Sequence, residues 1–143
     1  MRIQWAFLVL AAAVDVSQAQ PAGVDLTINS GAALPRSVLQ GVVGRAESIT
    51  IPVQNLGKTP AKFSVQAFLT QTPGGATRQQ LFVSKPLSIQ GLQTITAGTV
   101  AFTPTSAGDF IITVTVTSAV PNDTNSANDS QQFKIAAQPK PKK

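Results

Sequence analysis

The sequence contains no histidine and no cysteine, and these absences exclude several kinds of chemistry. Without histidine the chain lacks the commonest general base, and Ser-His-Asp and Cys-His catalytic arrangements are impossible. Without cysteine it can form no disulfide bond, and it offers no thiolate as a nucleophile, as a metal ligand or as a site for a lipid. The familiar nucleophilic active sites are therefore excluded, and the fold has to be held together by packing and hydrogen bonds.

Charged residues are scarce, at 12% of the chain. The acidic residues beyond position 19 are Asp25, Glu47, Asp109, Asp123 and Asp129. A hydrolase of the paired-carboxylate type needs two such groups across a cleft, whereas these residues fall at predicted strand edges and turns. Ser84 and Lys85 are adjacent, and neighbours on a strand point to opposite faces, so they make a poor catalytic dyad. We predict that the protein is not an enzyme.

Tryptophan and tyrosine are rarer still, since the chain has one tryptophan, Trp5, and no tyrosine. Sugar-binding faces usually use such rings, and nucleic-acid grooves combine stacking aromatics with basic residues. The net charge of +5 comes from scattered lysines and arginines, with a cluster only at Lys140–Lys143. Nucleic acid is therefore not an expected partner, and the basic tail is interpreted as a solvated segment.

The first residues have the order of a secretory signal peptide. Arg2 precedes an apolar run, Trp5–Val14, and Ser17 and Ala19 provide small residues before a cut after Ala19. The run is shorter than the roughly 20 residues needed to span a bilayer. We predict a signal peptide at residues 1–19, a mature chain that begins at Gln20 without a membrane span, and a periplasmic or secreted location. Export without disulfides favours a bacterial source.

Apolar and polar residues then alternate with the period of β-strands. The alternating segments are residues 24–28, 49–53, 62–69, 81–83, 100–102, 110–117 and 133–135. Each has one apolar face, so two sheets have to pack together to hide these faces. The sequence predicts an all-β fold: a single immunoglobulin-like antiparallel β-sandwich of about seven strands over residues 20–136, with a Pro/Lys-rich tail at 137–143.

The same alternation predicts the core. Residues expected to point inward are Ile49, Ile51, Val53, Phe63, Val65, Phe110, Ile112, Val114 and Val116. Pro52 cannot donate a ladder hydrogen bond, so it is expected at a bulge or an unpaired position. Residues 32–44 are predicted to be irregular. In the mixed stretch 86–98, core contacts are expected from Leu87, Ile89, Leu92 and Ile95.

Several short motifs resemble the bacterial CARDB domain, the cell-adhesion-related domain. They include Val24–Ile28, the turn pattern V-x-N-x-G at Val53, Asn55 and Gly57, the segment Ala107–Phe110 and the pair Asn128-Asp129. The resemblance extends over roughly residues 24–135. It implies an immunoglobulin-like sandwich used in adhesion, spacing or accessory binding, and it implies no reaction.

One loop is rich in side-chain oxygens. Asp123, Asn125, Asn128 and Asp129 fall within residues 122–130 and are weak candidates for calcium ligands. The EF-hand spacing fails, because Ala127 takes the place of the third ligand and Asn128 that of the glycine. Asn and Asp also stabilise turns, and this is the preferred interpretation. No cofactor and no bound metal are expected.

A partner surface is predicted on two neighbouring strands. Alternation turns Phe68 and Phe82 outward, where they would form a cross-strand pair and leave apolar surface exposed. The leading hypothesis is an exported, non-catalytic binding or adhesion module that contacts an extracytoplasmic protein partner through this face. The alternatives are a structural subunit that self-associates through sheet edges or faces and, less favoured, a hydrolase with an unrecognised site.

Overall fold

The computed structural model describes residues 22–28 and 38–143, so the predicted signal peptide lies outside the described residues. The described chain forms nine strands and one short 3-10 turn. The strands are β1 (Leu26–Thr27), β2 (Val38–Val42), β3 (Glu47–Asn55), β4 (Ala61–Thr72), β5 (Gly75–Val83), β6 (Leu87–Ile89), β7 (Thr94–Phe102), β8 (Gly108–Val120) and β9 (Ser130–Gln138). The 3-10 turn η1 covers Ser126–Asn128. Within the described part, no helix is long and apolar enough to cross a membrane.

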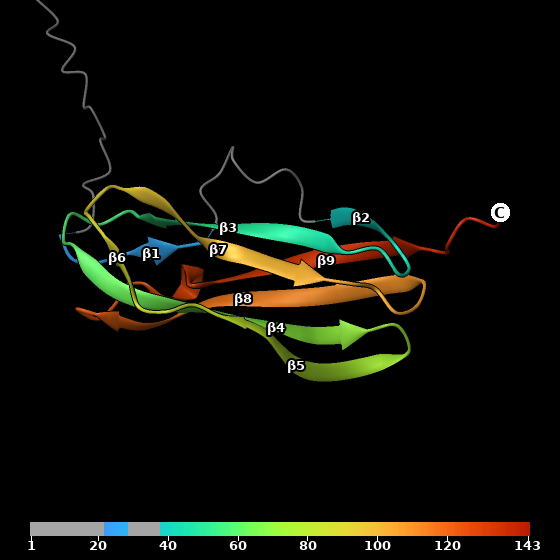
Figure 1. Ribbon diagram of the computed structural model, residues 1–143. Helices are drawn as coiled ribbons and strands as arrows, with labels where there is room; N and C mark the ends of the chain where they lie inside the picture. Colours follow the sequence, from blue (N-terminus) through green and yellow to red (C-terminus); the bar gives the residue numbers. More distant parts are fainter. Residues whose placement is uncertain (1–21, 29–37) are drawn as a thin grey trace, which may run out of the picture.

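The strands form two sheets that pack face to face (Figure 1). One sheet has the order β1-β3-β7, and the larger one has the order β2-β9-β8-β4-β5, with β6 paired to β4. All pairings are antiparallel except that of β2, which runs parallel to β9. The predicted all-β, immunoglobulin-like sandwich is confirmed, with more strands than expected.

The alternating pattern of the sequence places the core between the sheets. Along β8, Phe110, Ile112 and Val114 are at most 1% exposed, while Ile111 and Thr113 between them lie on the outer face and are partly exposed. Every residue of the predicted core set is buried. Burial of this apolar surface is the main stabilising contribution to such a sandwich, at about 25 cal/mol per Å² removed from water.

Parts of the predicted strand pattern are wrong. The stretch 32–44, predicted to be irregular, contains β2, whose partner β9 lies at the far end of the chain and leaves no local signal. Leu92, expected in the core, is 50% exposed at the turn between β6 and β7, where its φ of 63° places it in the left-handed region. In addition, β9 continues to Gln138, past the boundary predicted at residue 136.

Two bulges change the direction of side chains. The predicted irregularity at Pro52 is confirmed, because the β3–β7 register shifts between Ile51 and Pro52 and leaves Ala97 as the extra residue. A second bulge lies between β4 and β5. Ala67 is opposite Phe82 but Phe68 is opposite Gln80, so Leu81 is extra. Beyond this bulge the alternation along β5 is reversed.

The sandwich has two distinct ends (Figure 1). The loop end carries the β3–β4, β6–β7 and β8–β9 connections, and the first described residues lie there. The tail end carries the β4–β5 turn, the β7–β8 connection and the C-terminal tail.

Candidate functional site

At the loop end, the V-x-N-x-G turn is organised around Asn55, which is fully buried. Its Oδ1 accepts hydrogen bonds from the backbone N–H groups of Asp25 (3.3 Å) and Gly57 (3.0 Å). Its Nδ2 donates to the carbonyl oxygens of Thr59 (2.8 Å) and Gln90 (3.3 Å). A Cβ at position 57 would collide with the backbone of Gly23, which explains the glycine. The role of Asn55 is therefore structural: it joins three separate chain segments.

The oxygen-rich loop holds the N-terminal segment to the rest of the sandwich. Asp123 accepts hydrogen bonds from the backbone N–H of Leu26 (2.6 Å) and of Asn125 (2.7 Å). Asn128 donates from Nδ2 to Oδ1 of the buried Asp25 (2.8 Å). These contacts bridge β1 and the β8–β9 loop. Of the predicted candidates, Asp123 and Asn128 thus act on β1, while the side chain of Asn125 is exposed.

Asp129 completes this acidic group. Burial raises its pKa to about 7, and the negative charge of Asp123, a side-chain hydrogen bond with Asp123 and the charge of Asp25 act in the same direction. Oδ1 of Asp129 and Oδ1 of Asn128 are buried without a hydrogen-bond partner among the described atoms.

A metal site does not follow from this arrangement. In residues 22–28 and 38–143, no three His, Cys, Asp or Glu side chains are placed so that they could hold a metal ion. Both carboxylate oxygens of Asp123 are already engaged by backbone N–H groups. In the described structure, the loop holds β1 in place through Asp123 and Asn128.

The outer face of the larger sheet carries an aromatic residue paired with an arginine. The guanidinium Cζ of Arg78 lies 4.5 Å from the ring centroid of Phe68. Phe68 is partly exposed and Arg78 is exposed. A hollow of about 310 Å³ surrounds them, and its other lining residues are Gln66, Thr70, Thr113, Thr115 and Thr117. Such stacking is attractive by about 0.5–1 kcal/mol at an exposed site.

The sequence prediction for Phe68 is therefore partly met. The outward direction of Phe68 is confirmed, but its companion is Arg78 and not an aromatic residue. Arg78 was not singled out from the sequence. The alternation along β5 could have indicated it, because Arg78 and Gln80 lie on the same face of the strand and Gln80 is opposite Phe68.

The predicted outward position of Phe82 is wrong. Phe82 lies opposite the buried Ala67 and packs against the core, and its ring covers Gly98 of β7 so closely that a Cβ there would collide with it. The bulge at Leu81 explains the error, because one extra residue turns Phe82 to the inner face. Phe82 therefore bridges the two sheets, and it cannot form a surface pair with Phe68.

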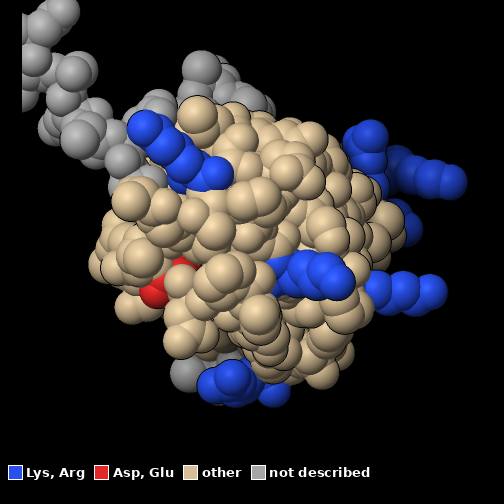
Figure 2. Space-filling view, turned by 90° about the vertical axis from the view of Figure 1, so that its left-hand side faces the viewer, with Lys and Arg blue, Asp and Glu red and all other residues tan. Residues whose placement is uncertain are grey.

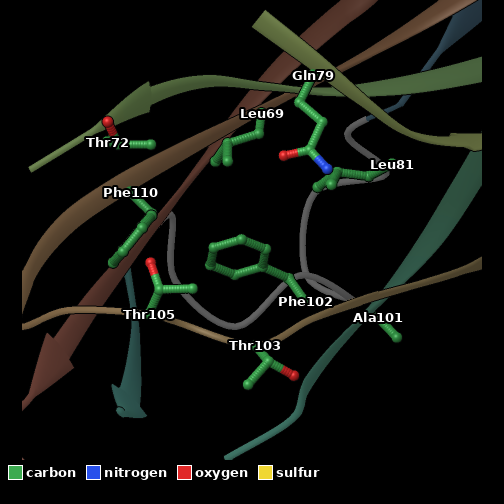
Figure 3. Close-up of a pocket in the computed structure, with 9 residues that line it drawn as sticks. All are labelled: Leu69, Thr72, Gln79, Leu81, Ala101, Phe102, Thr103, Thr105 and Phe110. Carbon is green, nitrogen blue, oxygen red and sulfur yellow. The ribbon is translucent and has the colours of Figure 1, made fainter. Parts of the chain in front are cut away.

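A pocket opens between the sheets at the tail end, with a volume of about 450 Å³. Its lining residues are Leu69, Thr72, Gln79, Leu81, Ala101, Phe102, Thr103, Thr105 and Phe110. Figure 3 shows the ring of Phe102 in the middle of this space, with Leu69 and Gln79 on one side and Thr105 beside it. The rings of Phe102 and Phe110 are tilted, with centroids 5.0 Å apart. None of the lining residues is charged.

Charged side chains do not gather into a patch at the loop end. Figure 2 shows Lys and Arg side chains at separate points around this end, with little acidic surface between them. The loop end therefore has no continuous basic groove. Elsewhere, near the start of β8, Asp109 forms a salt bridge with Lys134 at 2.8 Å, and both side chains are about half exposed. A pair of this kind contributes at most about 1 kcal/mol.

No protein-family model matches the sequence, and no curated protein matches it significantly. Solved structures resemble it in fold. A CARDB domain from Pyrococcus furiosus, crystallised in complex with di-metal ions, superposes with a TM-score of 0.55 at 17% identity, over 81% of this chain and 84% of that one. A β-glucosidase mutant from Listeria innocua, in complex with laminaribiose, gives a TM-score of 0.53 at 14% identity; the match covers 80% of this chain and 16% of the enzyme. The chain thus has the fold of a CARDB domain, the immunoglobulin-like sandwich to which its motifs pointed.

Proposed function

We propose that the protein is an exported, non-catalytic module that binds a protein partner in the periplasm or outside the cell. The observation that carries this proposal is the Phe68–Arg78 pair on the outer face of the larger sheet. Aromatic residues and arginine are enriched among the residues that contribute most to protein–protein binding energy. Here the two are already in contact, so little side-chain freedom has to be lost when a partner docks.

The surroundings of this pair suit a protein partner. The lining residues next to Phe68 and Arg78 are threonines and a glutamine, which are uncharged and offer hydroxyl and amide groups. Among the residues that the structure describes, no acidic side chain forms a salt bridge with Arg78. Its guanidinium group is therefore available for a carboxylate, so the partner is expected to present an acidic residue next to an apolar one.

The composition supports a non-catalytic role. The chain has neither histidine nor cysteine, and Asp109, one of its few acidic residues, is paired with Lys134. The likeness to a β-glucosidase concerns only 16% of that enzyme. A binding or adhesion function is also what the fold of a CARDB domain favours, whereas fold alone does not identify the partner.

A pull-down from the native cell envelope or culture medium, with the protein as bait, tests the proposal. The double variant Phe68→Ser/Arg78→Gln should retain at least about tenfold less of the captured protein, because both anchors are lost. The matched control, Val120→Ser/Lys62→Gln, also removes one exposed apolar side chain and one exposed charge, but at the loop end. It should retain the partner fully.

Retention of the partner by the folded Phe68→Ser/Arg78→Gln variant would contradict this assignment. Light scattering at micromolar concentration separates the alternative of a self-assembling structural subunit. A monomer supports the binding module, whereas oligomers that dissociate in the same double variant show that the partner is a second copy of the chain.

A further inference from the structure

The outer edge of β7 has no hydrogen-bonded neighbour among the described strands. β7 is the last strand of the smaller sheet and pairs with β3 on one side only. In the described part of the chain, no backbone or side-chain hydrogen bond reaches its other side. The strand contains no charged residue and no proline, the features that usually prevent another strand from pairing.

The other sheet edges are better protected. β1 is two residues long, and Asp123 caps the N–H of Leu26. β2 is short, at five residues. β5 carries Arg78, and its register with β4 shifts twice. β7 has one bulge, at Ala97, which leaves the regular run Gly98–Phe102 toward the tail end. This run is the part of the described surface most suited to accept a further strand.

The regular run of β7 leads into the pocket at the tail end. Ala101 and Phe102 belong to β7 and line the pocket, and the opposite wall comes from β4 and β5 through Leu69, Gln79 and Leu81 (Figure 3). An added strand would therefore meet unpaired backbone groups and a neighbouring cavity of about 450 Å³. In known complexes of this type, main-chain hydrogen bonds provide affinity and side-chain pockets provide specificity.

We propose that β7 binds an extended peptide segment of a partner protein as an additional strand, and that the pocket receives one bulky apolar side chain of that segment. The proposal rests on the proposed function, since it names the kind of segment that a protein partner supplies. The residues that line the pocket determine which side chain of the peptide it can accept. No charged residue is available to compensate a buried charge, whereas the Phe102 ring provides an apolar contact surface. The segment is therefore uncharged, with an aromatic or large aliphatic residue at its centre.

Fluorescence anisotropy tests the proposal with the full chain and a defined peptide. The peptide is fluorescein-labelled Thr-Val-Thr-Phe-Thr-Val-Thr with a neutral C-terminal amide. Its anisotropy should rise saturably with protein concentration. Replacing the central Phe by Ala should weaken binding about tenfold, because the pocket is left empty. Methylating alternate backbone nitrogens keeps every side chain but removes the donors of an added strand, and this should abolish binding.

Two variants locate the binding site on the protein. Gln79 lines the pocket and Gln80 points to the opposite face, and both are exposed. Gln79→Glu places a charge at the pocket and should weaken binding about tenfold, whereas the matched Gln80→Glu should leave it unchanged.

Three outcomes would overturn the inference: no saturable binding of the unmodified peptide, equal binding of the N-methylated peptide, or equal affinities of the two glutamate variants. If light scattering detects a dimer that the variant Thr99→Lys no longer forms, the inference is also overturned, because a second copy of the chain then occupies the edge. The pull-down with Phe68→Ser/Arg78→Gln concerns the opposite face of the larger sheet, so its failure is distinguishable from failure here.

Discussion

Replacement of Asn55 by alanine removes a side chain that is 0% exposed and makes four hydrogen bonds. The N–H groups of Asp25 and Gly57 then lose their acceptor in a buried environment, at about 1–3 kcal/mol for each group. The carbonyl groups of Thr59 and Gln90 are only partly buried and can bond to water instead. We therefore expect the free energy of unfolding to fall by about 3–4 kcal/mol.

Urea denaturation followed by far-ultraviolet circular dichroism measures this loss. Asn125→Ala is the matched control, because the side chain of Asn125 is exposed at the same end of the molecule. It should cost less than about 0.5 kcal/mol. A loss of less than about 1 kcal/mol for Asn55→Ala would refute the reasoning, since it would mean that the buried N–H groups find other acceptors.

The isosteric variant Asn55→Asp separates shape from hydrogen bonding. An ionised carboxylate still accepts from the N–H groups of Asp25 and Gly57, but it now faces the carbonyl oxygens of Thr59 and Gln90. We expect a large loss of stability at pH 7 that is partly recovered near pH 4, where a protonated carboxyl group can donate again. A loss independent of pH would show that the donor bonds contribute little.

Three further predictions concern the core, the acidic residues around Asp129 and the N-terminus. Val114→Ala, at a site with 0% exposure, should lower the free energy of unfolding by about 1–3 kcal/mol in a urea titration. The pKa of Asp129 is raised from an ordinary value of 3.8 to about 7 in the folded state, so folding favours the protonated carboxyl group. This contribution to stability is complete below about pH 4 and is lost as the pH rises through 7. Compared with the variant Asp129→Asn, the parent protein should therefore lose about 1 kcal/mol of its free energy of unfolding between pH 5 and pH 8; this value allows for screening by water at a partly exposed site. Parallel pH profiles of the two proteins would contradict this. Exported protein should have the intact mass of a chain that begins at Gln20 and should absorb almost nothing at 280 nm, because no tryptophan or tyrosine follows that residue; retention of residues 1–19 would disprove the cleavage.

The strands that could be predicted are those whose pattern is local. From Ile112 to Val116, apolar residues alternate with Thr113 and Thr115, and burial of one face of β8 follows directly from that period of two. Pro52 is informative for a similar reason, because its missing N–H has to fall at an irregular position whatever the neighbouring strand is.

The remaining features depend on residues that are distant in the sequence. The bulge at Leu81 contains no glycine or proline, so the local sequence does not indicate that Phe82 points inward. Its inward position is set by the space above Gly98 on the other sheet. Likewise, the turn motif identifies Asn55, but the bonds to Asp25 and Gln90 arise only when three segments meet. The alternation of residues within one strand carries no information about which distant segments come into contact.

The parallel pairing of β2 with β9 has a consequence for the order of folding. β2 lies near the beginning of the described chain and β9 at its end, so the edge of the larger sheet cannot form until the last strand has been synthesised. Contacts of such large sequence separation slow folding, because a long loop has to close before they are gained. A nascent chain therefore leaves β2 without its neighbour in the sheet until β9 has been synthesised.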